Sequence, residues 1–379
     1  MIFKLSEDHE QIRALAREFA QKKVAPHAIE YDKSHEYPWP NIHAMAEAGW
    51  LGMTMPEEYG NIGADTLSHA LVVEEISRAC AATGVILEVH NSLHAETILH
   101  FGNEEQKARF LPDLATGRKL GGFALTEPGA GSDAAAQETT AVPAGSEYVV
   151  NGRKCFITSG GKAHLYILMA MTDKSKGTKG ITAFVLEAGT PGLSYGLPED
   201  KMGIRCSCTS DLILEDCRLP AANRLGNEGD GFKIAMAALD GGRIGIAAQA
   251  LGIAQAALDA ATAYAKQRVQ FGKPIADLQA IQWKLAEMAT DIDAARLMTY
   301  RAAWLKDQPG RWSKEIAMAK LFASDVAMRH TVEAVQIHGG YGYMRDYQVE
   351  RYMRDAKITQ IYEGTSEVMK LIIAASILR

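Results

Sequence analysis

The chain has 379 residues, a formal net charge of −6 at pH 7, 47% hydrophobic residues and 23% charged residues. This length allows a substantial core and predicts two or three domains. The composition is typical of a folded globular protein. The acidic balance argues against a nucleic-acid-binding protein, because such proteins usually carry a basic domain or stripe.

The five cysteines are scattered and odd in number, which argues against a secreted disulfide framework. Cys206 and Cys208 lack the two-residue spacer and the second pair of a zinc site, so we interpret them as loop cysteines. Glu7, Asp8 and Glu10 interrupt the start of the chain, where a signal peptide would be apolar. No apolar run approaches the ~18 residues that span a bilayer. These features predict a soluble protein of a reducing compartment, the cytoplasm.

Residues 1–120 show the apolar spacing of helices. Ser6 is the expected N-cap of a helix whose apolar face ends at Pro26 and is formed by Ile12, Leu15, Ala16 and Phe19. The same spacing predicts helices over 39–50, 67–80 and 85–101, and a short capped helix beginning at Asn103. We therefore expect an all-α N-terminal domain.

Residues 121–228 favour strands. Asn151-Gly152 lies between two apolar stretches and predicts a hairpin, because Asn-Gly supplies the positive φ angles of a type I′ turn. Further strands are expected over 165–171, 181–186 and 212–214, separated by Gly, Pro and Asp. No long helix fits between them, so an antiparallel sheet or barrel is favoured over a parallel βαβ sheet.

Residues 229–379 return to helical spacing. An apolar seam steps by three and four residues from Leu278 to Ala295, as in a helix packed in a bundle. Pro309-Gly310 and Gly339-Gly340 separate the following helices, and a last helix is expected to begin near Thr365. The chain is thus predicted to have an α–β–α plan with domains over 1–120, 121–228 and 229–379.

Two short segments combine glycine with polar side chains. In the first, Thr126 to Ser132, glycines let backbone N–H groups approach a ligand and the hydroxyls add donors, although an ordinary Gly/Pro loop explains the same residues. In the second, Glu363 stands beside Ile361, Tyr362 and Gly364. Apolar surroundings would raise the pKa of Glu363 toward that of a general base. A solvent-exposed carboxylate before a helix capped by Thr365 is the competing interpretation.

Other segments have equally simple alternatives. Asp240 and Arg243 can be an N-cap and a surface cation, and Arg268 can complement a helix C-terminus. Gly129-Ala-Gly131 lacks the third glycine of a dinucleotide fingerprint. His90 and His94 share a helix face but have no third ligand, so we predict no metal site.

In combination, six collinear segments resemble the acyl-CoA dehydrogenase family over essentially the whole chain, and the short-chain (butyryl-CoA) members most closely. They are Phe123-Ala-Leu-Thr-Glu-Pro-Gly-Ala-Gly-Ser-Asp, Phe156-Ile-Thr-Ser-Gly-Gly, Leu239-Asp-Gly-Gly-Arg-Ile-Gly-Ile-Ala, Gln267-Arg-Val-Gln-Phe-Gly-Lys-Pro, Val335-Gln-Ile-His-Gly-Gly, and Met353-Arg-Asp-Ala-Lys through Ile361-Tyr-Glu-Gly-Thr-Ser-Glu. The resemblance implies a helical N-terminal domain, a middle antiparallel β-barrel or sheet, and a C-terminal four-helix bundle.

The resemblance also implies site residues. FAD would contact residues of the β domain, the last helix and a neighbouring subunit: Phe123, Leu125, Thr126, Gly131, Ser132, Phe156 and Thr158; Thr365 and Glu367; and Arg268, Phe271, Gln336, Gly339 and Gly340. The acyl-CoA would contact Ser132, Asp240, Arg243 and Gly364. Many members have tryptophan in place of Phe156. Isovaleryl- and long-chain-type members carry their base at the position of Gly242, which leaves Glu363 as the base here.

The implied activity is α,β-dehydrogenation of a short-chain acyl-CoA to the trans-2-enoyl-CoA in fatty-acid β-oxidation. Glu363 would remove the α-proton, the β-hydrogen would pass to flavin N5, and electrons would go to an electron-transfer flavoprotein. The enzyme would be a homo-oligomer, usually a tetramer. Branched, cyclic and dicarboxylic acyl-CoA esters remain alternatives, as does an oxygen-using acyl-CoA oxidase. Residues 85–98 and the Asp240 helix are expected to set acyl-chain preference. Glu88, His90 and His94 are expected to face solvent or another helix, and the alternative is that they add polarity near the acyl tail.

Overall fold

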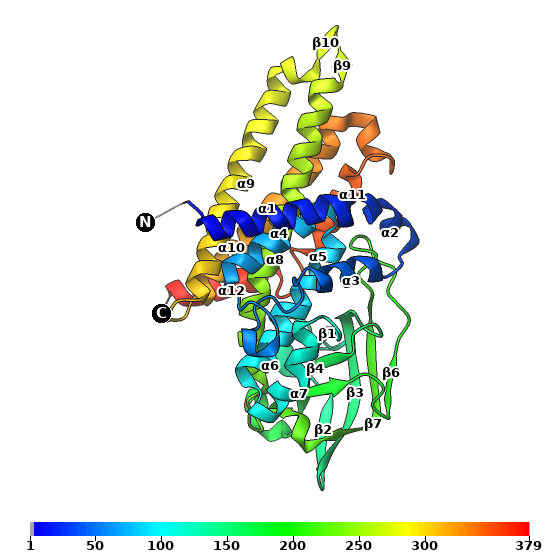
Figure 1. Ribbon diagram of the computed structural model, residues 1–379, viewed down its shortest axis with the longest axis vertical. Coiled ribbons are helices and arrows are strands. Elements are labelled where there is room, and N and C mark those ends of the chain that lie inside the picture. The colour runs from blue at the N-terminus through cyan, green and yellow to red at the C-terminus, as the bar shows by residue number, and fades with distance from the viewer. Residues whose placement is uncertain (1–3, 379) are drawn as a thin grey trace.

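A computed structural model describes residues 4–378. The sheet comes between two helical regions in the sequence, but in space these regions pack against each other and the sheet lies at one end of the molecule (Figure 1). The N-terminal helical region lies across the middle of the molecule and also packs on one side of the sheet. Its elements are α1 (Glu7–Phe19), η1 (Ala20–Val24), η2 (Ala25–His27), α2 (Ala28–Ser34), α3 (Trp39–Glu47), η3 (Glu57–Tyr59), α4 (Thr66–Ala79), α5 (Ala81–Glu88), η4 (Val89–Ala95), α6 (Glu96–Phe101) and α7 (Glu104–Ala115).

Two predicted helix starts are confirmed, but one predicted helix end is wrong. The Ser6 hydroxyl accepts the His9 N–H at 3.2 Å, and Asn103 forms a capping box with Gln106. Pro26 does not end the first helical segment, which continues as helical turns to Ser34. Proline lies in the first turn of the 3-10 helix η2, where its missing N–H removes no helical hydrogen bond.

The predicted helix over 85–101 is divided by a π-helical stretch. α5 ends at Glu88, η4 follows as a π-helix over Val89–Ala95, and α6 resumes regular geometry. A π-helix widens the turn and often occurs where a helix lines a functional site. All of η4 is buried.

The sheet is formed by β1 (Gly121–Ala124), β2 (Thr140–Ala144), β3 (Glu147–Thr158), β4 (Leu165–Met171), β5 (Ile181–Glu187), β6 (Leu193–Tyr195), β7 (Thr209–Pro220) and β8 (Arg224–Leu225). The strand order is β6-β7-β3-β2-β4-β5-β8, with β1 paired to β4. Most pairs are antiparallel as predicted, but β1 and β2 run parallel to β4. β4 is buried along its whole length.

The hairpin predicted at Asn151-Gly152 is wrong. β3 runs straight through these residues, and the chain reverses earlier, between Ala144 and Glu147. Gly152 instead accompanies a register shift in the pairing of β3 with β7. Its absent side chain is needed for close approach, because a Cβ there would lie 2.4 Å from the Thr139 hydroxyl.

The C-terminal region contains α8 (Gly231–Gln267), β9 (Val269–Gln270), β10 (Lys273–Pro274), η8 (Ile275–Asp277), α9 (Gln279–Lys306), α10 (Ser313–His338), η9 (Gly339–Tyr343), α11 (Val349–Ile358) and α12 (Ser366–Ile377). α8 and α9 extend away from the sheet and are joined at their far end by β9 and β10 (Figure 1). The N-cap interpretation of Asp240 is wrong, because α8 begins at Gly231 and contains Asp240 in its interior.

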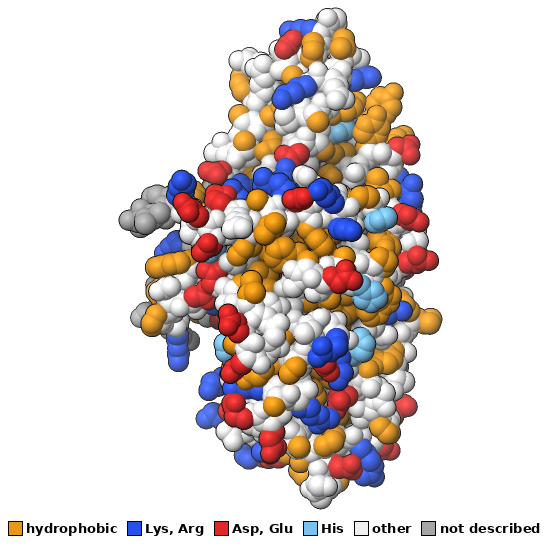
Figure 2. Space-filling view, viewed as in Figure 1, with side chains coloured by type: hydrophobic (Ala, Val, Ile, Leu, Met, Phe, Trp, Pro, Cys, Tyr) orange, Lys and Arg blue, Asp and Glu red, His pale blue; other side chains and the backbone are white. Residues whose placement is uncertain are grey.

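α8 is the central helix of the fold. It is long and apolar enough to cross a membrane by length and composition, but 78% of its most apolar 18-residue window is buried within the protein. Its extensive contacts with α4 and α10 identify it as a core helix. On the face shown in Figure 2, acidic and basic side chains are interspersed and hydrophobic side chains gather across the middle.

Candidate active site

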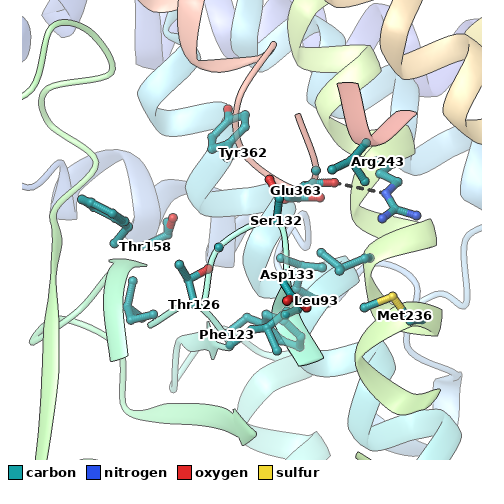
Figure 3. A pocket seen from close by; sticks show the side chains of 18 of the residues that line it. Leu93, Phe123, Thr126, Ser132, Asp133, Thr158, Met236, Arg243, Tyr362 and Glu363 are labelled. Atoms are coloured by element: carbon teal, nitrogen blue, oxygen red, sulfur yellow. Dashed lines mark hydrogen bonds between the residues drawn. The ribbon is translucent and has the colours of Figure 1, made fainter. Parts of the chain in front are cut away.

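A cavity of about 270 Å³ lies between the sheet, the start of α8 and the loop that precedes α12 (Figure 3). Residues from five separate parts of the chain line it, which explains why no single motif defines the site. They are Val89, Leu93, Phe123, Leu125, Thr126, Gly131 to Ala135, Phe156, Ile157, Thr158, Phe232, Met236, Leu239, Arg243, Tyr362, Glu363, Gly364 and Val368.

The sheet side of the cavity carries polar donors from the loop that follows β1 and from the last residue of β3. Figure 3 shows Thr126, Ser132 and Thr158 around the opening. Their three hydroxyls make no hydrogen bond with any residue in 4–378, so they are available to a bound molecule. Phe156 adds an aromatic side chain at the rim; it is 66% exposed and has a positive φ of 58°.

A buried ion pair holds this loop from beneath. Lys154 Nζ lies 2.7 Å from Glu127 Oε1 and also donates to the Leu125 carbonyl at 3.0 Å. Glu127 in turn accepts the Thr139 N–H at 3.0 Å. Burial lowers the pKa of Lys154 to about 8, whereas Lys154 holds the pKa of Glu127 below its ordinary value against the effect of burial. Neither residue was singled out from the sequence as a support of this loop.

The opposite wall carries Glu363 on a loop with two consecutive positive φ angles, 54° at Glu363 and 101° at Gly364. The left-handed region is costly for a residue with a side chain, about 1–3 kcal/mol, and persists where surrounding contacts enforce it. Arg243 Nε donates to the Glu363 carbonyl at 3.1 Å, and Lys320 Nζ donates to the Gly364 carbonyl at 2.7 Å. The Tyr362 hydroxyl also donates to the Gln249 side chain.

The Glu363 side chain is partly buried and lines the cavity. The solvent-exposed interpretation is therefore wrong, because the loop turns the carboxyl inward. Its Oε2 is buried and has no hydrogen-bond partner within residues 4–378. Burial raises the pKa of Glu363 to about 7, while Lys320 and Arg243 act in the opposite direction. A carboxyl with this pKa can accept a proton near neutral pH.

Arg243 is also not a surface cation. Its side chain is buried, and its Nη1 donates to Asp240 Oδ1 at 2.7 Å. Asp240 Oδ2 accepts from Ser313 at 2.6 Å, so Asp240 supports Arg243 from outside the lining. Thr365 caps α12 through the Val368 N–H, and exposed Glu367 follows in its first turn. Thr365 and Glu367 lie beside the cavity rather than among the lining residues.

A second cavity of about 580 Å³ lies at the far end of α8. Arg268, Phe271, Gly339 and Gly340 line it, and Gln336 lies nearby on α10 as an exposed residue. Arg243 and Arg268 are both on or directly after α8, and a rise of 1.5 Å per residue separates them by roughly 38 Å. The residues predicted from the sequence therefore lie in or beside two separate cavities of the chain.

Several lining residues were missed because they are ordinary apolar side chains in helices. Val89 and Leu93 come from η4, and Met236 and Leu239 come from α8. Their helical spacing resembles that of any core residue, so only the three-dimensional arrangement identifies them.

The expectation that Glu88, His90 and His94 face solvent or another helix is wrong in its first part, since all three are fully buried. His90 accepts the Gly121 N–H at 3.1 Å and lies 3.1 Å from the Leu114 carbonyl, and His94 lies 2.8 Å from the Gly122 carbonyl. The histidines thus join η4 to β1, and burial lowers the pKa of both. Within residues 4–378, no group of three His, Cys, Asp or Glu side chains is placed to hold a metal ion.

The family of the chain follows from matches to all three of its parts. The acyl-CoA dehydrogenase N-terminal domain matches residues 6–118, the middle domain matches 122–217, and the C-terminal domain matches 229–378. The chain therefore belongs to the acyl-CoA dehydrogenase family, whose members are flavin-dependent oxidoreductases of fatty-acid β-oxidation. Its helix–sheet–helix architecture is that of the family.

Within this family the chain is similar to short-chain members. It is 51% identical over 379 residues, the full length of both chains, to the short-chain specific acyl-CoA dehydrogenase of Clostridium acetobutylicum. The structure of butyryl-CoA dehydrogenase from Megasphaera elsdenii superposes over both complete chains with a TM-score of 0.98 and 51% identity. A chain in a structure described as the electron transferring flavoprotein of Acidaminococcus fermentans is 54% identical over both complete chains, with a TM-score of 0.99.

Proposed function

We propose that this protein oxidises a short-chain acyl-CoA, with butyryl-CoA as the reference substrate, to the trans-2-enoyl-CoA, and that Glu363 is the catalytic base. The observation that carries this proposal is the Glu363 carboxyl, which faces the cavity with a pKa of about 7 on a loop anchored by Arg243 and Lys320. The relatives described as short-chain and butyryl-CoA dehydrogenases support the substrate class.

The cavity fits FAD as the cofactor. Free hydroxyls of Thr126, Ser132 and Thr158 and the rings of Phe123 and Phe156 match a planar, polar-edged group bound against the sheet. We also assign Leu125, Gly131, Thr365 and Glu367 to its binding. When bound, FAD would accept the β-hydrogen of the substrate with its electron pair, as the α-proton leaves and the carbon–carbon double bond forms.

The residues of the chain position the substrate and move one proton. Ser132, Arg243 and Gly364 line the acyl-CoA side of the cavity, and Asp240 orients Arg243. The Glu363 N–H, which makes no hydrogen bond within residues 4–378, is available to the thioester oxygen. A donor at this position stabilises the negative charge that develops on that oxygen, an effect of about 10²–10³-fold in rate. Apolar side chains, including Val89, Leu93 and Leu239, exclude water around the reacting carbons.

We further propose that two subunits complete each flavin site. The second cavity, which Arg268, Phe271, Gly339 and Gly340 line and Gln336 lies near, is roughly 38 Å along α8 from Arg243, too far to reach the cofactor bound beside Thr126 in the same chain. A neighbouring copy can supply them, which requires a homo-oligomer; we propose the tetramer. Electrons would leave to an electron-transfer flavoprotein, a partner supported by the Acidaminococcus fermentans structure.

An anaerobic titration of the purified protein with butyryl-CoA tests the proposal through the visible flavin spectrum. Bleaching of the oxidised band is the expected result. A yellow protein that does not bleach would move the substrate to a branched, cyclic or dicarboxylic acyl-CoA. A colourless protein that cannot be reconstituted with FAD would overturn the cofactor assignment, and rapid aerobic reoxidation with peroxide formation would indicate an oxidase.

Glu363→Gln tests the base. The amide keeps the size of the side chain but cannot accept the α-proton, so turnover should fall by about 10²–10⁴-fold. Flavin content should remain that of the wild type. Turnover within threefold of wild type would refute the role of Glu363, whatever the substrate proves to be.

A further inference from the structure

A second carboxyl lies behind the proposed base. Glu88, the last residue of α5, is 0% exposed, and its Oε1 accepts from the Ser92 hydroxyl. Its Oε2 is buried without a hydrogen-bond partner in residues 4–378, as is Glu363 Oε2. A buried carboxyl oxygen without a partner is costly, so two such oxygens in one place require an explanation.

Both carboxyls rest on the same face of α8. A Cβ built on Gly242 would lie 2.1 Å from Glu363 Oε2, and a Cβ built on Gly245 would lie 2.2 Å from Glu88 Cγ. Residues three apart on a helix are neighbours on one face. The two glycines therefore leave adjacent spaces that the two glutamate side chains occupy, with Leu93 also at Gly242, and they place the carboxyls beside one another.

The surroundings favour ionisation of Glu363 rather than Glu88. Arg243 and Lys320 act on Glu363 and lower its pKa against burial. Glu88 is acted on by Glu363 and Glu96, and burial together with these charges raises its pKa well above the ordinary value. Lys306 Nζ lies 2.6 Å from Glu96 Oε2, so its charge is paired with that carboxylate. The remaining neighbour is the Tyr362 hydroxyl, which donates a hydrogen bond to the Gln249 side chain. Burial raises the pKa of Tyr362, so this hydroxyl stays neutral.

We propose that Glu88 is a positioning residue that retains its proton and donates it in a hydrogen bond to Oε2 of Glu363. The pair then carries one negative charge, located on Glu363, and the second oxygen of Glu363 is left for the α-proton. When that proton is taken up, both carboxyls are neutral and no further charge has to be buried. Two carboxyls in contact share a proton in this way because both cannot ionise together. The inference rests on the proposed role of Glu363 as base.

Two substitutions separate hydrogen bonding from packing. Glu88→Gln keeps a donor at the same position and cannot ionise, whereas Glu88→Met fills the same space without a donor. The measurement is kcat/KM of the holoenzyme for butyryl-CoA against pH. We expect the acid limb of Glu88→Gln to coincide with that of wild type. The acid limb of the Glu88→Met profile should shift to higher pH by about one unit or more. On that limb, kcat/KM of the variant should therefore be about tenfold lower than that of wild type.

An infrared difference spectrum provides a readout that does not depend on turnover. At pH 8, above the pKa of about 7 of Glu363, the wild type should still show the carbonyl band of a buried protonated carboxylic acid. Glu88→Gln should lose this band, and Glu363→Gln should retain it. Glu74→Gln is the matched control, because Glu74 is a buried carboxyl paired with Arg296 at 2.9 Å; it should change neither the band nor the pH profile.

The two proposals fail in distinguishable ways. If Glu363→Gln turns over like wild type, the base is misassigned, and the infrared band still reports the protonation of Glu88. If Glu363→Gln is inactive but the Glu88→Met profile coincides with wild type, the positioning role is overturned. It is also overturned if Glu88→Gln shifts as far as Glu88→Met, or if Glu88→Gln loses no carboxylic acid band.

Discussion

Arg243 ties the loop of the proposed base to the central helix through the backbone of Glu363. Its Nε donates to the Glu363 carbonyl at 3.1 Å, while its Nη1 is held by Asp240 at 2.7 Å. This contact fixes a residue with a positive φ without touching its carboxyl. The base is therefore positioned through its main chain and is free to change protonation state.

Arg243→Lys tests this anchoring. Lysine keeps the charge, but one ammonium cannot reproduce the forked geometry that contacts both Glu363 and Asp240. We expect kcat/KM to fall by about 10²-fold, the loss that a displacement of roughly 1 Å produces at a reacting group. Steady-state kinetics with butyryl-CoA provide the measurement. An unchanged kcat/KM in a fully flavinated variant would show that Lys320 and Tyr362 suffice to hold the loop.

Two adjacent glycines in α8 should respond differently to alanine. At Gly242 a Cβ meets Glu363 Oε2 at 2.1 Å and Leu93 Cδ2 at 2.7 Å, so Gly242→Ala should displace the base and lower kcat by about 10²-fold. At Gly241 the nearest atom is Lys306 Nζ at 3.2 Å, which a flexible side chain can move. Gly241→Ala should keep its kcat, because the added methyl group does not displace the base. It should also stabilise the helix, because alanine favours a helix over glycine by about 1 kcal/mol. Equal kcat in both variants would contradict the geometry.

Lys154 should be essential to the stability of the sheet-side loop. Lys154→Met removes one partner of a buried ion pair and leaves Glu127 without its counter-charge, a loss of about 3–5 kcal/mol in the free energy of unfolding. Urea unfolding measures this loss, and the flavin content after gel filtration shows whether the loop still binds the cofactor. The control is Lys176→Met, which removes a solvent-exposed pair with Asp173 and should leave the free energy of unfolding nearly unchanged.

The sequence predicted the helix–sheet–helix plan because helical spacing and strand composition change where the architecture changes. It failed at Asn151-Gly152, since the local preference for a turn is overridden by the pairing of β3 with β7. It also placed Asp240 at a helix start, because the two glycines after it resemble a helix boundary. In the structure those glycines, Gly241 and Gly242, belong to α8 and provide close approach.

The candidate site was predictable wherever a loop carried glycine beside a polar residue, as at Thr126 to Ser132 and at Glu363. It was not predictable at Lys320, and at Glu88 the sequence offered polarity near the acyl tail only as an alternative, because both are charged residues within helical segments. Such residues normally face solvent, and nothing local distinguishes the buried ones. Burial of Glu88 depends on the space above Gly245, which lies 157 positions away in the sequence.

The raised pKa of Glu363 predicts opposite effects of pH on activity and on stability. The base must be ionised, so kcat/KM should fall about tenfold per unit below pH 7. Stability behaves in the other direction, because the folded state holds the Glu363 proton more tightly than the unfolded state, whose pKa is near the ordinary 4.5. The stabilisation that this proton binding gives the folded state is present in full below pH 4.5 and is lost as pH rises through about 7.

Urea unfolding of wild type and Glu363→Gln at pH 5 and pH 8 isolates this stabilisation, since the glutamine variant lacks the ionisation. The stability of wild type relative to Glu363→Gln should decrease between the two pH values. A difference that stays constant would mean that the Glu363 carboxyl has the same pKa in the folded and unfolded states.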